Sequence, residues 1–289
     1  MDIALKERAK NQIFKFGLAF GGKDINPYTL DFESQKYRQR DLAGLLRDSV
    51  EYFALTEDEF KELPHSELRR TAYTRISDAK SNSKGDYGEL LLFLILDIFY
   101  DCPKFVTKAR LRSTTADQIK GFDCAHYTVE DDELILWLGE AKFHQSFSTA
   151  LSSAFNSIDN LFNDAGSVKS ELKLLSGNIE INKNSGLKEK IRTETNGGKS
   201  LDKVNIKVPV LLTYDSKVLN NVEGSEEADL EHENLKAELR KELKRNAALI
   251  ERKEWLNKKN INFEFFLFPF LEVKILKDVL EKIEEANKI

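Results

Sequence analysis

Apolar and polar residues alternate in blocks through the middle of the chain, and these blocks predict a run of short strands. Two segments rich in apolar, aromatic and β-branched residues occupy roughly residues 121–129 and 134–143, with Glu130-Asp131-Asp132-Glu133 between them. Apolar segments of this length around a short polar break are typical of a β-hairpin. A similar segment at residues 104–110 predicts a third strand just before the hairpin.

Helical patterns lie on both sides of these strands. In residues 86–100 an apolar segment follows Asp86, which can cap a helix, and Pro103 lies just past its end. Residues 145–165 carry one apolar stripe and one polar face, as an amphipathic helix does. The later elements that we predict are a strand at 206–214, a charged helix or pair of helices at 226–259, a strand at 263–270 and a helix at 272–289.

The order of these elements predicts an α/β fold with a mixed sheet and helices on both faces, because antiparallel strands give way to alternating strands and helices. We expect a helical N-terminal region at residues 1–80 and a second domain, containing the sheet, at residues 81–289. In the first region, residues 41–53 are amphipathic and Thr56-Glu57-Asp58-Glu59 fits a capped helix start. In the second, residues 176–203 are rich in glycine, asparagine and charge, and predict a mobile insertion.

Composition narrows the classes of protein. The chain has 289 residues, of which 41% are hydrophobic and 32% charged, and its formal net charge is −5. This charge argues against a generally basic nucleic-acid binder, so any nucleic-acid contact must use local basic patches such as residues 104–120 and 236–259. Two cysteines do not make a disulfide framework, and no apolar segment approaches the ~20 residues that cross a bilayer. We therefore expect a soluble, cytoplasmic protein with no membrane contact.

Glu140 and Lys142 carry the strongest chemical signal, because residues two apart on a strand project from the same face. If the hairpin turns between Asp131 and Asp132, Asp123 lies directly opposite Glu140, with Cβ atoms about 4.5–5.5 Å apart. Two carboxylates this close repel each other unless a cation lies between them, and their oxygen ligands suit Mg²⁺ or Mn²⁺. The pattern predicts a metal-dependent phosphodiesterase site.

Three motifs, in this order, carry a family resemblance: Gly85-Asp86-Tyr87-Gly88-Glu89, Gly121-Phe122-Asp123 and Gly139-Glu140-Ala141-Lys142. The set resembles the PD-(D/E)xK nuclease superfamily and, more narrowly, the HamA nucleases of the Hachiman anti-phage system. No proline precedes Asp123, so the dipeptide that gives the superfamily its name is missing. The resemblance implies a restriction-endonuclease-like core in which Asp123 and Glu140 bind Mg²⁺, Glu89 supports the metal and Lys142 assists the attacking water.

The resemblance also implies partners. The substrate would be DNA, and a superfamily-2 helicase, HamB, would restrain the nuclease until phage infection perturbs DNA. Two other functions stay open from the sequence. The chain could be a regulatory or binding subunit of the helicase with little nuclease activity, or a stand-alone restriction or repair nuclease.

Each of the four site residues also has a purely structural interpretation. Glu140 and Lys142 could form a simple ion pair where a strand reaches solvent, and Asp123 could be a polar residue at a hairpin edge. Glu89 lies three residues after Asp86, which is the spacing of a capping box at a helix N-terminus. Metal binding and helix capping can coexist at Glu89.

The weaker candidates lie on either side of these motifs. His144 and Gln145 are candidate substrate contacts, because a glutamine just past Glu-x-Lys lines the site in some related nucleases, but they also fit a rim residue and a helix N-cap neighbour. The segment from Gly17 to Lys23 nearly matches a phosphate-binding loop, yet Asp24 replaces the Ser or Thr that would contact Mg²⁺. We therefore expect no ATP site in this chain. The histidines and cysteines lack the spacing of a zinc site.

Overall fold

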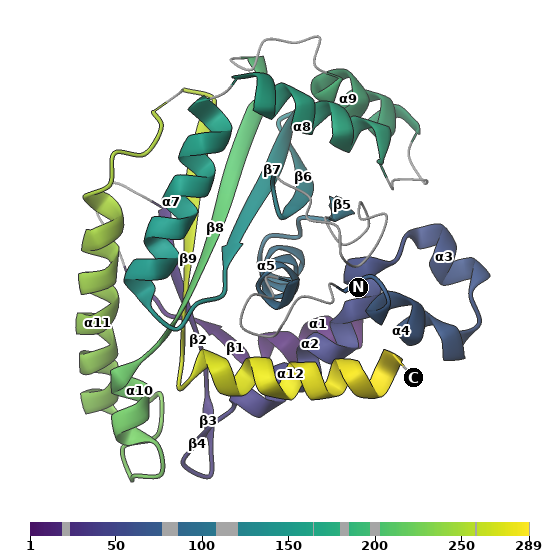
Figure 1. The fold of residues 1–289 in the computed structure, drawn as a ribbon. Coiled ribbons are helices and arrows are strands. Elements are labelled where there is room, and N and C mark those ends of the chain that lie inside the picture. The colour runs from purple at the N-terminus through teal and green to yellow at the C-terminus, as the bar shows by residue number, and fades with distance from the viewer. Residues whose placement is uncertain are drawn as a thin grey trace.

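A seven-stranded mixed sheet forms the centre of the molecule (Figure 1), with eleven helices in the part of the chain that the structure describes. The computed structural model describes residues 1–18, 24–76, 86–107, 121–163, 165–179, 185–196, 203–257 and 259–288. The strands, in their order across the sheet, are β1 (Ile13–Lys15), β2 (Asp24–Leu30), β9 (Ile261–Phe270), β8 (Asn205–Asp215), β7 (Glu133–Lys142), β6 (Cys124–Glu130) and β5 (Lys104–Thr107). The predicted α/β fold class with a mixed sheet is confirmed.

Strand direction divides the sheet into a parallel centre and two antiparallel edges. β2, β9, β8 and β7 run parallel, whereas β1 pairs antiparallel with β2, and β6 pairs antiparallel with both β7 and β5. Parallel strands are usually buried on both faces, and β8 fits this rule because eight of its eleven residues are buried. The sheet is therefore covered by helices on both sides.

The hairpin of β6 and β7 has the predicted register. Its pairs run from Cys124 opposite Gly139 to Glu130 opposite Glu133, and the turn lies at Asp131 and Asp132. Both turn residues have positive φ, of 49° and 64°, as a two-residue hairpin turn of the favoured twist requires. This register fixes which residues of β7 lie next to the start of β6.

Two groups of helices cover the two faces of the sheet (Figure 1). On the first face, α5 (Asp86–Phe99) packs on β7, and α1 (Ile3–Lys10), α2 (Gln39–Ala54), α4 (His65–Tyr73) and α12 (Val273–Lys288) surround it in one hydrophobic cluster. On the second face lie α7 (Phe147–Asn163), α8 (Ala165–Gly177) and the C-terminal half of α11 (Glu233–Glu251). All but the last residue of α5 is buried, so this helix forms the centre of the first face.

The N-terminal region contributes to the sheet as well as to the helical layer, which differs from the helical region predicted for residues 1–80. β2 pairs along β9, with Asp24 opposite Glu264 and Pro27 opposite Leu267. The sequence concealed this strand because Asn26-Pro27 is a turn signal and a proline lacks the N–H of a strand ladder. Here Pro27 takes part through its carbonyl, which accepts a hydrogen bond from the Phe16 N–H at 2.8 Å.

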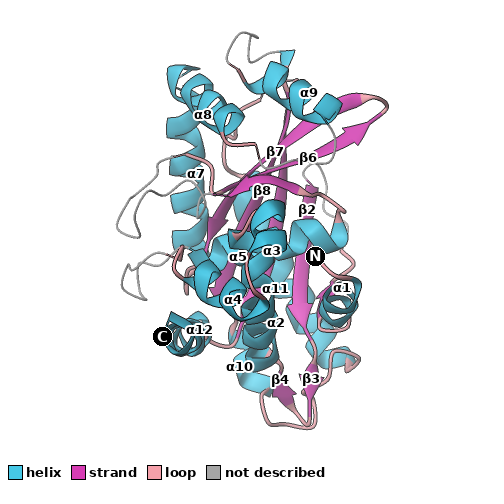
Figure 2. Cartoon of the chain, turned by 90° about the vertical axis from the view of Figure 1, so that its right-hand side faces the viewer, coloured by secondary structure: helices cyan, strands magenta, loops and turns pink. Residues whose placement is uncertain are grey.

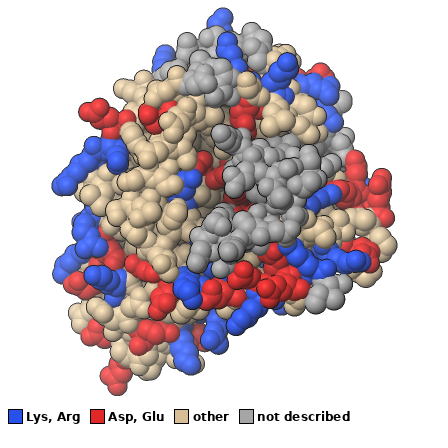
Figure 3. Space-filling model, viewed as in Figure 1, with Lys and Arg blue, Asp and Glu red and all other residues tan. Residues whose placement is uncertain are grey.

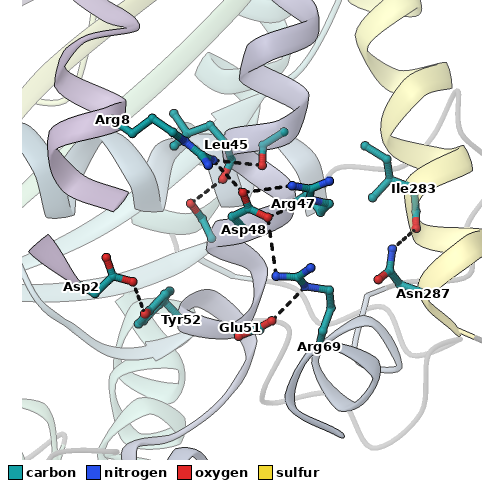
Figure 4. Close-up of polar contacts among 12 residues, drawn as sticks. Asp2, Arg8, Leu45, Arg47, Asp48, Glu51, Tyr52, Arg69, Ile283 and Asn287 are labelled. Carbon is teal, nitrogen blue, oxygen red and sulfur yellow. Dashed lines mark hydrogen bonds and ion pairs between the residues drawn. The ribbon is translucent and has the colours of Figure 1, made fainter. Parts of the chain in front are cut away.

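Polar contacts tie the N-terminal helices together (Figure 4). Asp48 of α2 lies 2.8 Å from an Arg8 guanidinium nitrogen on α1 and 3.6 Å from an Arg69 nitrogen on α4. Arg69 also contacts Glu51 at 2.9 Å. These ion pairs join three helices around one buried apolar surface, which makes the N-terminal helices an integral part of the first face.

Several element boundaries differ from the sequence prediction. The predicted insertion at residues 176–203 contains a helix, α9 (Ser185–Thr195), and α11 is much shorter than the helix predicted over 226–259. Before α11 the chain turns, and the side chain of Asp229 accepts a hydrogen bond from the Glu231 N–H at 2.8 Å. Aspartate side chains that bond to nearby N–H groups compete with the helix in this way. The last part of the strand predicted at 104–110 lies outside the described residues.

The remaining elements are short. A capping box formed by Thr56 and Glu59 begins α3 (Glu57–Glu62), as predicted. A two-stranded ribbon, β3 (Phe32–Glu33) with β4 (Lys36–Tyr37), and α10 (Lys217–Val222) lie near one end of the molecule, and α8 and α9 lie at the other (Figures 1 and 2). Of the helices in the described ranges, none has the length and apolar character needed to span a membrane.

Candidate functional site

β7 ends in an enclosed ion pair. Trp137 and Ala141 of this strand face the α5 cluster, whereas Leu136 and Leu138 face the α7 cluster. Since side chains alternate along a strand, Glu140 and Lys142 continue the row of Leu138. The Lys142 ammonium lies 2.5 Å from a Glu140 carboxylate oxygen, and the two side chains are 17% and 5% exposed. This pair differs from a solvated strand end, because the Glu140 side chain is almost fully buried.

Asp123 joins this pair at the point where β6 and β7 separate. The β6–β7 ladder ends at Cys124 and Gly139, and one residue earlier the Asp123 N–H still donates to the Gly139 carbonyl at 2.8 Å. The Asp123 carboxylate then accepts a hydrogen bond from the Ala141 N–H, also at 2.8 Å. Ala141 lies between Glu140 and Lys142, so the buried Asp123 carboxylate is held beside both charged residues.

The segment before Asp123 packs closely against a residue that the sequence did not predict to lie there. Gly121 has a φ of +123°, and a Cβ at this position would lie 2.2 Å from an oxygen of Glu171. Glu171 belongs to α8 and is itself buried. Only glycine combines this backbone conformation with such a close contact. The conformation therefore explains why Gly121 precedes Phe122 and Asp123 in the motif.

Glu89 reaches the same end of β7 from α5. It is buried, and its neighbour Gly88 packs so closely that an added Cβ would lie 3.0 Å from Cβ of Phe143. Burial, followed by the nearby charges of Asp123 and Glu89, raises the pKa of the Cys124 thiol well above its usual value. One thiol therefore has both carboxylates in its vicinity, although Glu89 belongs to a helix and Asp123 to the sheet.

His144 and Gln145 lie on the rim of this site. The Thr213 hydroxyl of β8 donates to the Lys142 and His144 carbonyls at 3.3 and 3.2 Å, which fixes the chain as it leaves β7. His144 is half-buried, whereas the Gln145 side chain is exposed. Burial, and then the charges of Lys277 and Lys142, lower the pKa of His144. Lys277 of α12 is thus a rim residue that the sequence offered no signal for.

The donor set fits a hard divalent cation in part. Asp123 and Glu140 supply buried carboxylate oxygens, which are the ligands that Mg²⁺ prefers, and this ion usually keeps several waters. In the described ranges no three acidic, histidine or cysteine side chains are grouped closely enough to hold a metal by themselves. A metal here would therefore depend on water or substrate oxygens besides these two carboxylates.

Charge on this side of the molecule is mixed. Figure 3 shows acidic and basic groups interspersed over the face that Figure 1 presents, including some of both signs in a central recess. Such a surface gives local rather than global attraction to a polyanion. The site therefore has to bind any nucleic acid through a few positioned groups.

The mixed sheet, its helical layers and the carboxylate–lysine set at the end of β7 define an α/β fold of the nuclease-like kind. A family model described as HamA matches residues 17–283, and the chain belongs to the HamA family. Membership makes it a component of the Hachiman anti-phage defence system. No curated protein matches the sequence.

Proposed function

We propose that this chain is a metal-dependent DNA nuclease, the effector of an anti-phage defence complex. The observation that carries the proposal is the placement of buried Asp123 beside the Glu140–Lys142 pair at the point where β6 leaves β7. Removing a carboxylate and an ammonium from water costs free energy. Buried charged pairs of this kind are therefore often found at sites where the charges take part in binding or catalysis. Family membership and the nuclease-like fold support the same reaction class.

The residues have separate roles in this proposal. Asp123 and Glu140 would hold Mg²⁺ or Mn²⁺, and Glu89 would support it. Such an ion, when bound, stabilises negative charge on a phosphoryl oxygen and lowers the pKa of bound water. Lys142 would orient the water that forms the new P–O bond and offset the growing charge on the phosphate. The water gives up a proton, and the leaving sugar oxygen takes one, so the phosphodiester is hydrolysed.

Cleavage assays with matched variants test this function. Glu140→Gln and Lys142→Ala should each reduce Mg²⁺-dependent DNA cleavage by at least a hundredfold, because each removes a group that acts on the transition state. Glu133→Gln is the control, since Glu133 lies on the same strand, is exposed and accepts a hydrogen bond from Asn205 that an amide can also accept. Strong cleavage in EDTA, or equal cleavage by all three variants, would overturn the proposal.

We further propose that a superfamily-2 helicase restrains the nuclease and brings it to DNA. The net charge of −5 and the interspersed charges on the face that Figure 3 shows support this, because neither gives the chain a general attraction for DNA. Purified chain should therefore cut DNA poorly alone, and well with the helicase and its ATP. Full activity without a partner would favour a stand-alone nuclease. A partner-bound chain without cleavage would favour a regulatory subunit.

A further inference from the structure

Lys277 extends the candidate site onto a helix that the catalytic motifs do not include. Its ammonium lies 5.5 Å from the centre of the Phe143 ring, and Phe143 is the residue between Lys142 and His144. The Phe143 ring is fixed in turn by an edge contact with Phe270, at 5.8 Å between ring centres. The ammonium of α12 is thus held over the chain segment that directly follows Glu140 and Lys142.

Two lysine ammonium groups act on the rim of this site. Lys277 is half-buried, and burial lowers its pKa. The charges of Lys277 and Lys142 both act on the half-buried His144 ring. Lys142 has its partner in Glu140, whereas Lys277 and His144 have no ion pair with any described residue. A half-buried ammonium without a counter-ion is unfavourable, and an anion bound here would reverse that cost.

The arrangement indicates which anion fits. Phe143 belongs to the α5 cluster, whereas Lys142 continues the row that faces the α7 cluster, so Lys277 and Lys142 approach the end of β7 from different faces. Both charges act on His144, so an anion held by Lys277 and His144 would lie at the same end of β7 as the carboxylate site. A nucleic-acid strand carries one phosphate on each nucleotide, so a second phosphate of the bound strand fits this description. A lysine binds phosphate as a point charge, without base recognition. Binding of this kind does not depend on the base sequence.

We propose that Lys277 and His144 form a second phosphate subsite that binds the DNA phosphodiester next to the scissile one. The proposal rests on the proposed nuclease function for the identity of its ligand. Lys277 would position the strand across the end of β7 without taking part in bond cleavage. Its loss should therefore weaken substrate binding and leave the chemical step intact.

Binding in EDTA tests the subsite without cleavage. With the full chain and a labelled DNA oligonucleotide, Lys277→Ala should raise Kd about tenfold, as expected for loss of a charge-assisted contact. The slope of log K against log salt should fall by roughly one, the value for one phosphate contact. Lys277→Arg should keep most of the affinity. Lys282→Ala, an exposed lysine on the same helix, should change Kd less than twofold.

A neutral methylphosphonate placed at single positions of the oligonucleotide locates the contact. One position, adjacent to the scissile phosphate, should weaken binding to the wild-type chain but not to Lys277→Ala. In Mg²⁺ the same variant should raise KM with kcat within twofold of wild type. Equal Kd for Lys277→Ala and Lys282→Ala would overturn the subsite.

The outcomes separate this proposal from the one on which it rests. If Lys277→Ala weakens DNA binding but no variant or wild-type chain cleaves DNA with Mg²⁺, the nuclease function fails and the phosphate subsite stands. If cleavage depends on Glu140 and Lys277→Ala has a wild-type Kd and KM, only the subsite fails. If inorganic phosphate binds in a Lys277-dependent way and DNA does not, the site belongs to a free anion and the proposal is wrong.

Discussion

Gly139 of β7 packs tightly against both β6 and α5. A Cβ at this position would lie 2.6 Å from the Cys124 sulfur and 2.8 Å from a methyl carbon of Leu92. Gly139→Ala should therefore destabilise the fold by about 1–3 kcal/mol, the usual cost of overpacking a core. It should also shift Glu140 and reduce cleavage. Urea unfolding and a cleavage assay on the same protein measure the two effects.

A second substitution provides the control for Gly139. Cys124→Ala removes the sulfur that the new methyl group would meet, so the double variant should recover part of the stability lost by Gly139→Ala. Contacting residues of this kind show non-additive effects. Additive losses in the double variant would mean that the sulfur does not limit the space beside Gly139.

His126 predicts a pH dependence of stability. It is fully buried, its ring Nδ1–H donates to the Cys102 carbonyl at 2.7 Å, and burial lowers its pKa to about 4. The unfolded chain binds a proton near the ordinary pKa of 6.5, so this contribution to stability is complete above pH 6.5 and is lost as the pH falls toward 4. The loss should reach about 3 kcal/mol.

Unfolding of the wild type and of His126→Gln between pH 7.5 and 4.5 isolates this effect from other groups that titrate. Glutamine can still donate to the Cys102 carbonyl but does not titrate. The wild type should lose stability more steeply than the variant below pH 6.5. Parallel curves would show that His126 has the same pKa in the folded and unfolded states.

At the scale of single residues, the sequence predicted the site residues whose positions follow from regular strand geometry. It did not predict the residues that only tertiary packing brings near the site. Hairpin symmetry about Asp131 and Asp132 places Asp123 next to the Glu140 strand position, and the structure has this register. Lys277 lies more than a hundred residues away on an amphipathic helix, where one half-buried lysine resembles any other. Glu171 escaped notice for the same reason, since its packing against Gly121 is a tertiary contact.

Among the elements, β2 joins the N-terminal region to the sheet of the predicted second domain. It inserts between β1 and β9, and its residues Tyr28 and Leu30 are buried in the first-face cluster. We predict that deleting residues 1–30 abolishes cooperative unfolding, because β9 loses one of its two neighbouring strands and the hydrophobic cluster of the first face loses Tyr28 and Leu30. Circular dichroism during urea unfolding of the truncated chain checks this. A stable, active truncation would show that β2 is an accessory strand.

Element prediction worked where one local pattern dominated. The apolar segment of α5 and the amphipathic stripe of α7 gave helices close to their predicted bounds, and β8 and β9 were found from buried apolar runs. β1 and β2 were missed because a proline and nearby glycines suggested turns, although tertiary pairing decides the outcome there. α11 was predicted too long, because charge continues past both ends while local turns stop the helix at Glu233 and Glu251.

On the scale of the whole molecule, we expect the proposed partner to contact either residues 1–80 or the charged helix α11. One side of this helix is buried, through Leu235, Leu239 and Leu243, and the other is exposed. Basic groups appear along the left edge of Figure 3, the side on which Figure 1 places α11. The exposed basic residues of the helix are Arg240, Lys241, Lys244 and Arg245.

Charge reversal of these four residues should weaken binding to the helicase or to DNA at least tenfold, because electrostatic complementarity directs association. The fold should stay intact, since none of the four side chains is buried. Co-purification and DNA binding at several salt concentrations measure the effect. Unchanged affinity for both ligands would place the partner surface elsewhere. Glu-to-Gln substitutions on the same helix are the control, because they also change the charge of the helix.

The pairing of β2 with β9 has a consequence for how the protein is made. Residues 24–27 need residues 264–267 as neighbours, so the sheet cannot close until residues 264–267 have left the ribosome. Contacts between segments so distant in sequence make folding slow, because the loop between them must first be ordered. β8 lies between β7, the strand that carries Glu140, and β9. A ribosome-bound chain that has not yet reached β9 would therefore lack the assembled sheet that positions the proposed nuclease site, and the host would not meet that site before β9 is made.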